Sequence, residues 1–203
     1  MRAFVLSILF FITSSAFFLK LVFASDYEKA FRALNKGDYE KAAYFLSFYA
    51  SNGDAIAQYN MGLLYRDGLG VEKNQKMSLS WLILAAQQDH MLANYAVAKI
   101  IHKGSTNNVS LDQALEFYKQ AAFLGHAVSP IDIGQIYFVR NESPRDLIRA
   151  FVWWSLAAER NAPGALENIE KIQNDLSDKQ MHEISRILEI CDIEPIKKCL
   201  SDL

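Results

Sequence analysis

The sequence predicts an all-α fold, an α/α superhelical solenoid of stacked helix pairs that ends in a C-terminal capping helix. A first observation is a period of 36 residues in the small residues Ala50, Ala86, Ala122 and Ala158. A second is the same interval in the aromatic residues Phe45, Trp81, Phe117 and Trp153. A third is the scarcity of strand-like alternation. One helix pair cannot bury its apolar face alone, whereas stacked pairs share a continuous core.

The composition is that of a folded chain. Of the 203 residues, 51% are hydrophobic and 22% charged, with 9 Gly and 4 Pro, which excludes a disordered chain or a collagen-like fibre. The formal net charge of −2 gives no basic surplus, so we expect no nucleic-acid partner.

The first 24 residues predict a signal peptide. Arg2 precedes an uncharged apolar stretch, Ala3–Leu19, and Val22 and Ala24 occupy the positions three and one residues before a cleavage site. Cleavage after Ala24 would export the protein to a bacterial periplasm or the medium, with no membrane contact afterwards. The alternatives are an uncleaved membrane anchor or a buried helix of the fold.

Residues 25–176 are the predicted repeat domain, in which each repeat contributes two helices. The clearest pair is Ala55–Arg66 and Met77–Gln88, separated by a loop in which Gly68 stops the first helix. Trp81 and the other large residues of the aromatic columns are expected in the core. A further column of small residues marks where backbones approach closely: Gly62, Ala98 and Gly134.

One segment of the repeats carries a family motif. Residues 57–71 read AQYNMGLLYRDGLGV and are followed by Trp81 and Ala85–Ala86. This text resembles the Sel-one-like repeats, relatives of the tetratricopeptide repeats, although the later copies depart from it, for example with Ile101 in place of Tyr. The resemblance covers Asp26 to about Glu170. It implies a scaffold or adaptor, and exported members of this family resemble regulators of periplasmic signalling and host-interaction factors.

Residues 177–203 are predicted to form a capping helix and a tail. Ser177 and Gln180 have the spacing of a capping box. One apolar face follows, formed by Met181, Ile184, Leu188 and Cys191. In an exported protein we expect a disulfide between Cys191 and Cys199; free or intermolecular thiols are the alternative.

No catalytic residue, metal site or cofactor is predicted. The chain has no G-x-S-x-G or phosphate-binding loop, and His182-Glu183 lacks the second histidine of a zinc-protease motif because Arg186 stands there. His90 and His126 lie one period apart, for which we expect a packed or solvated structural role rather than a metal pair.

Without a catalytic or metal site, the candidate functional residues are those of a binding surface. If tetratricopeptide geometry carries over, the first helix of each pair lines a concave groove that takes a protein or peptide ligand. The groove residues would be Tyr59, Leu63, Arg66, Tyr95, Lys99, His102, Ile131, Gln135 and Phe138. The alternative is that several of them pack between helices.

The sequence therefore predicts an exported helical-repeat module for protein–protein interactions. One rival is an enzyme that acts on glycan or cell-wall material through acidic residues of several repeats. The other is an assembly scaffold anchored in the membrane by an uncleaved first helix.

Overall fold

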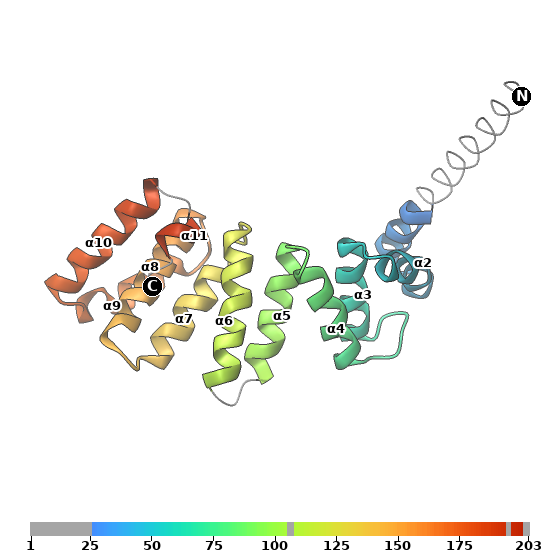
Figure 1. Ribbon diagram of the computed structural model, residues 1–203, viewed down its shortest axis with the longest axis horizontal. Helices are drawn as coiled ribbons and strands as arrows, with labels where there is room; N and C mark the ends of the chain where they lie inside the picture. Colours follow the sequence, from blue (N-terminus) through green and yellow to red (C-terminus); the bar gives the residue numbers. More distant parts are fainter. Residues whose placement is uncertain (1–25, 105–107, 194–195, 201–203) are drawn as a thin grey trace, which may run out of the picture. The chain divides into compact units, whose positions relative to one another are not determined.

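The computed structural model of the protein describes residues 26–104, 108–193 and 196–200, so the predicted signal peptide lies outside the described residues. All regular structure in this part of the chain is helical, and consecutive helices form pairs (Figure 1). A helix that includes residues 26–36 comes first. The following helices are α2 (Tyr39–Ser51), α3 (Ala55–Asp67), α4 (Gln75–Ala86), α5 (Met91–Gly104), α6 (Asn108–Phe123), α7 (Ser129–Arg140), α8 (Pro144–Glu159), α9 (Ala165–Ile172), α10 (Asp178–Ile193) and α11 (Ile196–Cys199), with a 3₁₀ turn at Gln173–Asp175.

The chain forms two compact units, and the boundary between them lies after Ala85. The first unit has a core of small and aliphatic side chains, among them Ala42, Leu46 and Met61, with Trp81 partly buried against it. The second unit has a core centred on Trp153. The aromatic columns are thus only partly core: Tyr137 and Trp153 are buried, whereas Phe45, Tyr65, Trp81 and Phe117 are half-buried.

The predicted pair of helices in the first unit is present, with a shift in the second member. It begins at Gln75 rather than Met77, because the Asn74 side chain accepts a hydrogen bond from the Met77 N–H at 3.0 Å and so caps the helix. It ends at Ala86 rather than Gln88.

The column of small residues does mark close approaches. A Cβ on Gly62 would lie 2.6 Å from Cγ of Leu82, and a Cβ on Gly134 would lie 2.5 Å from Nε1 of Trp154. Both distances are shorter than any ordinary carbon contact, so each position accepts only glycine without a shift of its neighbour.

The same period appears in the turns that follow the second helices. Residues with positive φ stand 36 positions apart at Gly53 (93°), Asp89 (56°), Gly125 (97°) and Asn161 (55°). The N–H of each donates to the alanine carbonyl three residues earlier, at 2.9–3.1 Å. Glycine, Asp and Asn are the residues that enter this backbone conformation at least cost, so the turn is repeated although its residue varies.

Three of these four alanine carbonyls also accept a hydrogen bond from a side chain further along the chain. The bonds are Gln58 Nε2 to Ala50 O (3.1 Å), Asn94 Nδ2 to Ala86 O (3.3 Å) and an Arg160 guanidinium N–H to Ala122 O (3.0 Å). The third repeat has Pro130 where the others have an amide, and proline has no side-chain donor. Arg160 supplies the missing donor and also reaches the His126 carbonyl at 3.3 Å.

A residue of one further column binds the first turn of each of the helices α3, α5 and α7. The side chains of Asp54, His90 and His126 accept from the backbone N–H three residues later, at 2.7, 3.2 and 3.1 Å. This contact satisfies a donor that the first turn of α3, α5 or α7 leaves without a helical partner. The expected structural role of the two histidines is confirmed, because each caps its own helix.

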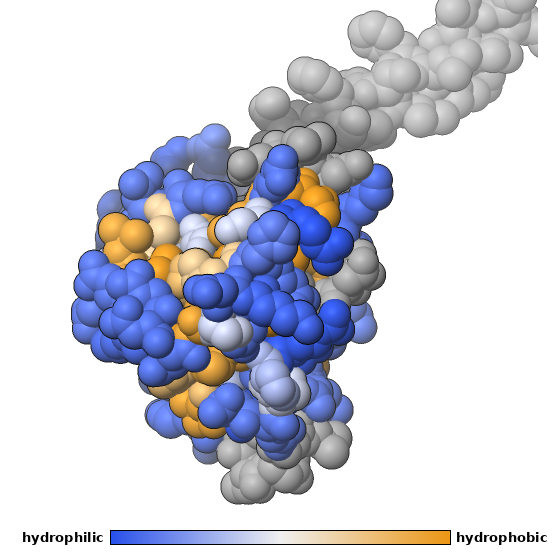
Figure 2. All heavy atoms as spheres, turned by 90° about the vertical axis from the view of Figure 1, so that its left-hand side faces the viewer, coloured by the Kyte–Doolittle hydropathy of each residue, from blue (hydrophilic) through white to orange (hydrophobic). Residues whose placement is uncertain are grey.

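The C-terminal helices close the second unit as the sequence predicts. Ser177 N–H and Oγ both bond the side chain of Gln180, and the Gln180 N–H returns to Ser177 Oγ at 3.4 Å, which is a capping box at the start of α10. The apolar face of α10 packs on the core through Ile184. Cys191 and Cys199 form the expected disulfide. Figure 2 shows mainly hydrophilic residues on this end, as a terminal cap requires.

Candidate functional site

The nine residues predicted for partner binding lie on the first helices of three successive pairs. Three are on α3 in the first unit, three on α5 and three on α7, both in the second unit. None of the nine is fully buried, and Lys99, Gln135 and Phe138 are exposed. That the residues of both units share one concave groove stays a prediction.

In the first unit, the cation of this set is already paired. Arg66 makes a two-pronged contact to its neighbour Asp67, from Nε at 2.9 Å and from Nη2 at 2.8 Å. This hydrogen bond raises the pKa of Arg66 and lowers that of Asp67. Tyr59 is half-buried, and burial raises the pKa of its phenol. Both side chains of the pair remain about two-fifths exposed, so a partner carboxylate would have to compete with Asp67.

In the second unit, the predicted rows on α5 and α7 come together at Asp132, which the sequence did not single out. The Tyr95 hydroxyl on α5 and the Asp132 carboxylate on α7 are close enough for each to shift the pKa of the other. Among the described residues, Oδ2 of Asp132 has no hydrogen-bond partner although the atom is buried. We name Tyr95, Lys99, His102, Ile131, Asp132, Gln135 and Phe138 the α5–α7 face.

The electrostatics of the α5–α7 face follow from this half-buried carboxylate. Burial raises the pKa of Asp132, and the charge of Lys99 and the nearby Tyr95 hydroxyl oppose that rise without cancelling it. Burial, followed by the Asp132 charge, raises the pKa of Tyr95 to about 12. The Lys99 ammonium lies 5.8 Å from the centre of the Tyr95 ring, near the limit of a cation–π contact.

Three members of the α5–α7 face, Tyr95, His102 and Ile131, pack partly against the core. The Tyr95 ring centre lies 4.1 Å from that of His126, and Nδ1 of His102 lies 3.3 Å from the hydroxyl of the buried Tyr118. Ile131 packs against a small cluster that includes Ala157. For these residues the alternative of packing between helices is therefore partly correct, and each still shows part of its surface to solvent.

The end of the α7 row is more open. Phe138 is 37% exposed, and its ring centre lies 5.7 Å from that of Trp154, so the core holds one side of the ring and solvent reaches the other. Gln135 is exposed one turn earlier. Together with Lys99 on α5, the face offers an amide, an aromatic ring and a cation, which suits recognition of peptide carbonyls and side chains.

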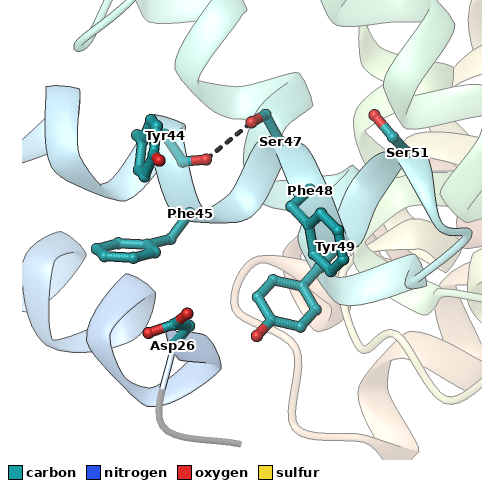
Figure 3. Close-up of a pocket in the computed structure, with 7 residues that line it drawn as sticks. All are labelled: Asp26, Tyr44, Phe45, Ser47, Phe48, Tyr49 and Ser51. Atoms are coloured by element: carbon teal, nitrogen blue, oxygen red, sulfur yellow. Dashed lines mark hydrogen bonds between the residues drawn. The ribbon is translucent and has the colours of Figure 1, made fainter. Parts of the chain in front are cut away.

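A second candidate site, which the sequence analysis missed, lies on α2 in the first unit (Figure 3). A pocket of about 500 Å³ is lined by Asp26, Tyr44, Phe45, Ser47, Phe48, Tyr49 and Ser51. Tyr44 is 75% and Phe48 49% exposed, unusual for large aromatic side chains. The sequence signal was the presence of four aromatic residues within six positions, because one helix cannot turn them all towards its core.

Two of the four aromatic rings of the α2 pocket lie on the same side of the helix as a carboxylate. Figure 3 shows Phe45 and Tyr49 extending on the side of α2 where Asp26 lies. The rings of Tyr44 and Phe45, and those of Phe48 and Tyr49, form edge-to-face pairs with centres 5.3 and 5.4 Å apart. Such mutual support orders the rings while leaving their outer faces open.

Other kinds of site have no support in the described part of the chain. It contains no group of three or more His, Cys, Asp or Glu side chains that could hold a metal ion. None of its helices is both long enough and apolar enough to cross a membrane. The histidines of the capping column are occupied with backbone N–H groups.

Comparison with known proteins places the repeats in a family. Residues 55–90, 92–126 and 131–161, half of the chain, match the Sel1 repeat family model. The chitin synthase regulator SKT5 of Saccharomyces cerevisiae is 38% identical over 133 residues, 57% of this chain and 19% of that protein. The putative sel1-like repeat-containing protein L21 of Acanthamoeba polyphaga mimivirus is 32% identical over 98 residues, 48% of this chain and 17% of that protein.

Solved structures agree. A Sel1 repeat protein from Oxalobacter formigenes superposes with a TM-score of 0.60 at 29% identity, over 66% of this chain and 55% of that one. The protective antigen c5321 of uropathogenic Escherichia coli, with an SLR fold, gives 0.59 at 28% identity, over 66% of this chain and 29% of that one. The chain spans less than a fifth of the curated relatives and about half or less of these solved chains. Its repeats, its helical solenoid fold and these matches show that the chain belongs to the Sel1 repeat family.

Proposed function

We propose that the protein is an exported binding module whose α5–α7 face takes a peptide or helix of a protein partner. The observation that carries the proposal is the exposure of Lys99, Gln135 and Phe138 on α5 and α7, two helices whose Tyr95 and Asp132 side chains interact electrostatically. An aromatic ring seated on a core residue loses little freedom on binding, and a nearby cation and amide add directional contacts. Sel1 repeat proteins typically mediate protein–protein interactions, which agrees with this assignment.

The α3 row in the first unit is proposed as a further part of the partner site. Tyr59 and Leu63 are half-buried and contribute apolar surface, while Arg66 contributes a guanidinium that Asp67 orients. The complete proposed set is Tyr59, Leu63, Arg66, Tyr95, Lys99, His102, Ile131, Gln135 and Phe138.

Export to a bacterial periplasm or the medium is the second part of the proposal. The apolar stretch Ala3–Leu19 and the small residues before Ser25 support it. The Cys191–Cys199 disulfide supports it independently, because such bonds persist in oxidising compartments. The solved relatives are bacterial, and one is described as a protective antigen. Edman sequencing of the purified exported protein should begin at Ser25; a chain that retains Met1 would replace this proposal with the anchored scaffold.

Site-specific photocrosslinking tests the binding face. A benzoylphenylalanine at Gln135 in the producing cells should yield a discrete crosslinked product with one partner. The matched control is the same group at Glu116, which is 69% exposed on α6, outside the proposed face. Equal crosslinking at both positions, or at Glu116 alone, would remove the α5–α7 face from the proposal.

Substitution of Phe138 then measures how much its aromatic ring contributes to the affinity for the partner. Phe138→Ala should weaken capture of the crosslinked partner by about tenfold, the scale of an interface hot spot. Val139→Ala, at a neighbouring residue that is 71% exposed, should leave capture unchanged. A circular-dichroism melt of both variants separates a loss of binding from a loss of folding, because Phe138 also touches Trp154.

A further inference from the structure

A cationic pocket lies in the C-terminal part of the second unit, on α8, α10 and α11, and none of the residues proposed for partner binding lines it. Its volume is about 130 Å³, and three guanidinium groups line it, from Arg145 and Arg149 on α8 and Arg186 on α10. In a chain whose formal net charge is −2, three arginines around one cavity form a local excess of positive charge.

The carboxylates near the pocket do not neutralise all three cations. Asp146 is committed elsewhere: one oxygen accepts from Arg149 at 2.8 Å, and the other accepts the N–H groups of Glu142 and Ser143 at 3.0 Å. Glu183 is the acidic residue of the pocket lining, and its oxygen lies 3.8 Å from Nη2 of Arg145, too far for a hydrogen bond.

Arg186 is the cation that remains. Within residues 26–104, 108–193 and 196–200 it makes no salt bridge or side-chain hydrogen bond, and it is exposed. The guanidinium of Arg149, in contrast, is held over the Tyr137 ring at 5.3 Å from its centre as well as by Asp146. The pocket therefore combines one fixed guanidinium with two that have donors to spare.

The apolar residues that line the pocket increase the attraction of its arginines for an anion. Ile148 and Ile187, which are 3% and 9% exposed, form apolar lining, and a low-dielectric surface increases the attraction between the arginines and an anion. Cys199 lines the same pocket, and its disulfide to Cys191 ties α11 to α10. Lys197 and Lys198 lie on α11, the helix that carries Cys199.

We propose that this pocket binds a phosphate group, either as the free ion or as the terminal phosphate of a larger ligand such as a phospholipid headgroup. Guanidinium groups pair with phosphate through parallel N–H···O bonds. One such fork satisfies a carboxylate, whereas three guanidinium groups from two helices match the several oxygens and the double charge of a terminal phosphate. The small volume suits this group rather than a whole organic ligand.

The test is isothermal titration of the oxidised full-length chain with inorganic phosphate. Arg186→Gln should weaken binding about tenfold, because it removes a charge-assisted contact without breaking any contact of the folded chain. Lys179→Gln is the matched control, since it removes one positive charge from the exposed first turn of the same helix, outside the pocket lining. Lys179→Gln should bind as the unchanged protein does.

Glu183→Gln separates a phosphate site from a merely structural arginine cluster. Removal of this carboxylate leaves the cations without a competing anion, so the affinity for phosphate should rise several-fold. If Glu183 instead serves to hold the arginines in place, the same variant would bind more weakly. Acetate should bind at least tenfold more weakly than phosphate to the unchanged protein.

Vesicles distinguish the two sources of the phosphate. Cosedimentation with phosphatidylcholine vesicles that contain phosphatidic acid, abolished by Arg186→Gln but not by Lys179→Gln, would identify a lipid headgroup. Binding of inorganic phosphate without cosedimentation would identify a soluble ligand. Absence of binding in both arms, or equal effects of Arg186→Gln and Lys179→Gln, would overturn the proposal.

Discussion

The close approach at Gly134 gives the sharpest quantitative prediction. In Gly134→Ala the new methyl group would lie 2.5 Å from Nε1 and 2.6 Å from Cδ1 of Trp154. Ordinary contacts between such atoms are about 3.5–4.0 Å, so the ring must move by about 1 Å. Trp154 is only 1% exposed and belongs to the packed core of the second unit, so the variant strains that core.

The cost follows from three contributions. Overpacking of a filled core costs about 1–3 kcal/mol. The shift also disturbs the hydrogen bond from Trp154 Nε1 to the Ile131 carbonyl, now 3.2 Å long, which is worth about 1 kcal/mol. Alanine is favoured over glycine inside a helix by about 1 kcal/mol, which offsets part of the loss. We expect Gly134→Ala to lower the free energy of unfolding by about 2 kcal/mol.

Gly104→Ala is the matched control in the same unit. Gly104 is the last residue of α5, and a Cβ there would meet no heavy atom within 4 Å. This variant should be neutral or up to about 1 kcal/mol more stable. Urea unfolding followed by far-ultraviolet circular dichroism compares both variants in one transition. Equal stability of Gly134→Ala and Gly104→Ala would refute the close packing of Gly134 against Trp154.

Three further predictions concern contacts outside that core. Arg160→Ala should lower the free energy of unfolding by about 1.5–3 kcal/mol in urea, because it leaves the Ala122 carbonyl without its side-chain donor; an unchanged midpoint would show that water replaces the bond. Serine at Cys191 and Cys199 should cost about 2–3 kcal/mol, and the unchanged protein should gain two daltons on reduction. Burial, aided by the charge of Arg160, lowers the pKa of His126 in the folded protein. The free energy of unfolding should therefore decrease as the pH falls below about 6.5, the ordinary pKa of histidine. Urea titrations at several pH values should show a weaker pH dependence for His126→Asn.

The fold could be predicted because its determinants recur along the chain. The alanine and glycine columns repeat in kind as well as in spacing, so Gly62 and Gly134 are visible as matching positions. The capping column is visible only in part: His90 and His126 repeat one period apart, but Asp54 makes the same kind of contact with a different side chain. Different side chains can accept the same backbone hydrogen bond, whereas no other residue fits where a close approach leaves room only for glycine.

The candidate sites were predictable only in part. The rows on α5 and α7 follow from helical period, but Asp132 has no signature in the sequence, since its partners come from another helix. The α2 pocket was not predicted for a different reason: Phe45 belongs to an aromatic column that includes the buried Trp153, and such a column predicts core positions rather than a pocket. The sequence shows Arg186 only as the residue that replaces the second histidine of a zinc-protease motif. Its convergence with the arginines of α8 depends on the tertiary structure.

The donors to the repeat carbonyls have a consequence for building new proteins from this chain. In the first two instances the donor lies 8 residues beyond its acceptor, so a transplanted cassette carries both halves of the bond. In the third the donor lies 38 residues beyond, at Arg160, more than one repeat away. Copies of the earlier cassettes can therefore be spliced in tandem, whereas the last one can be moved only together with the segment that follows it.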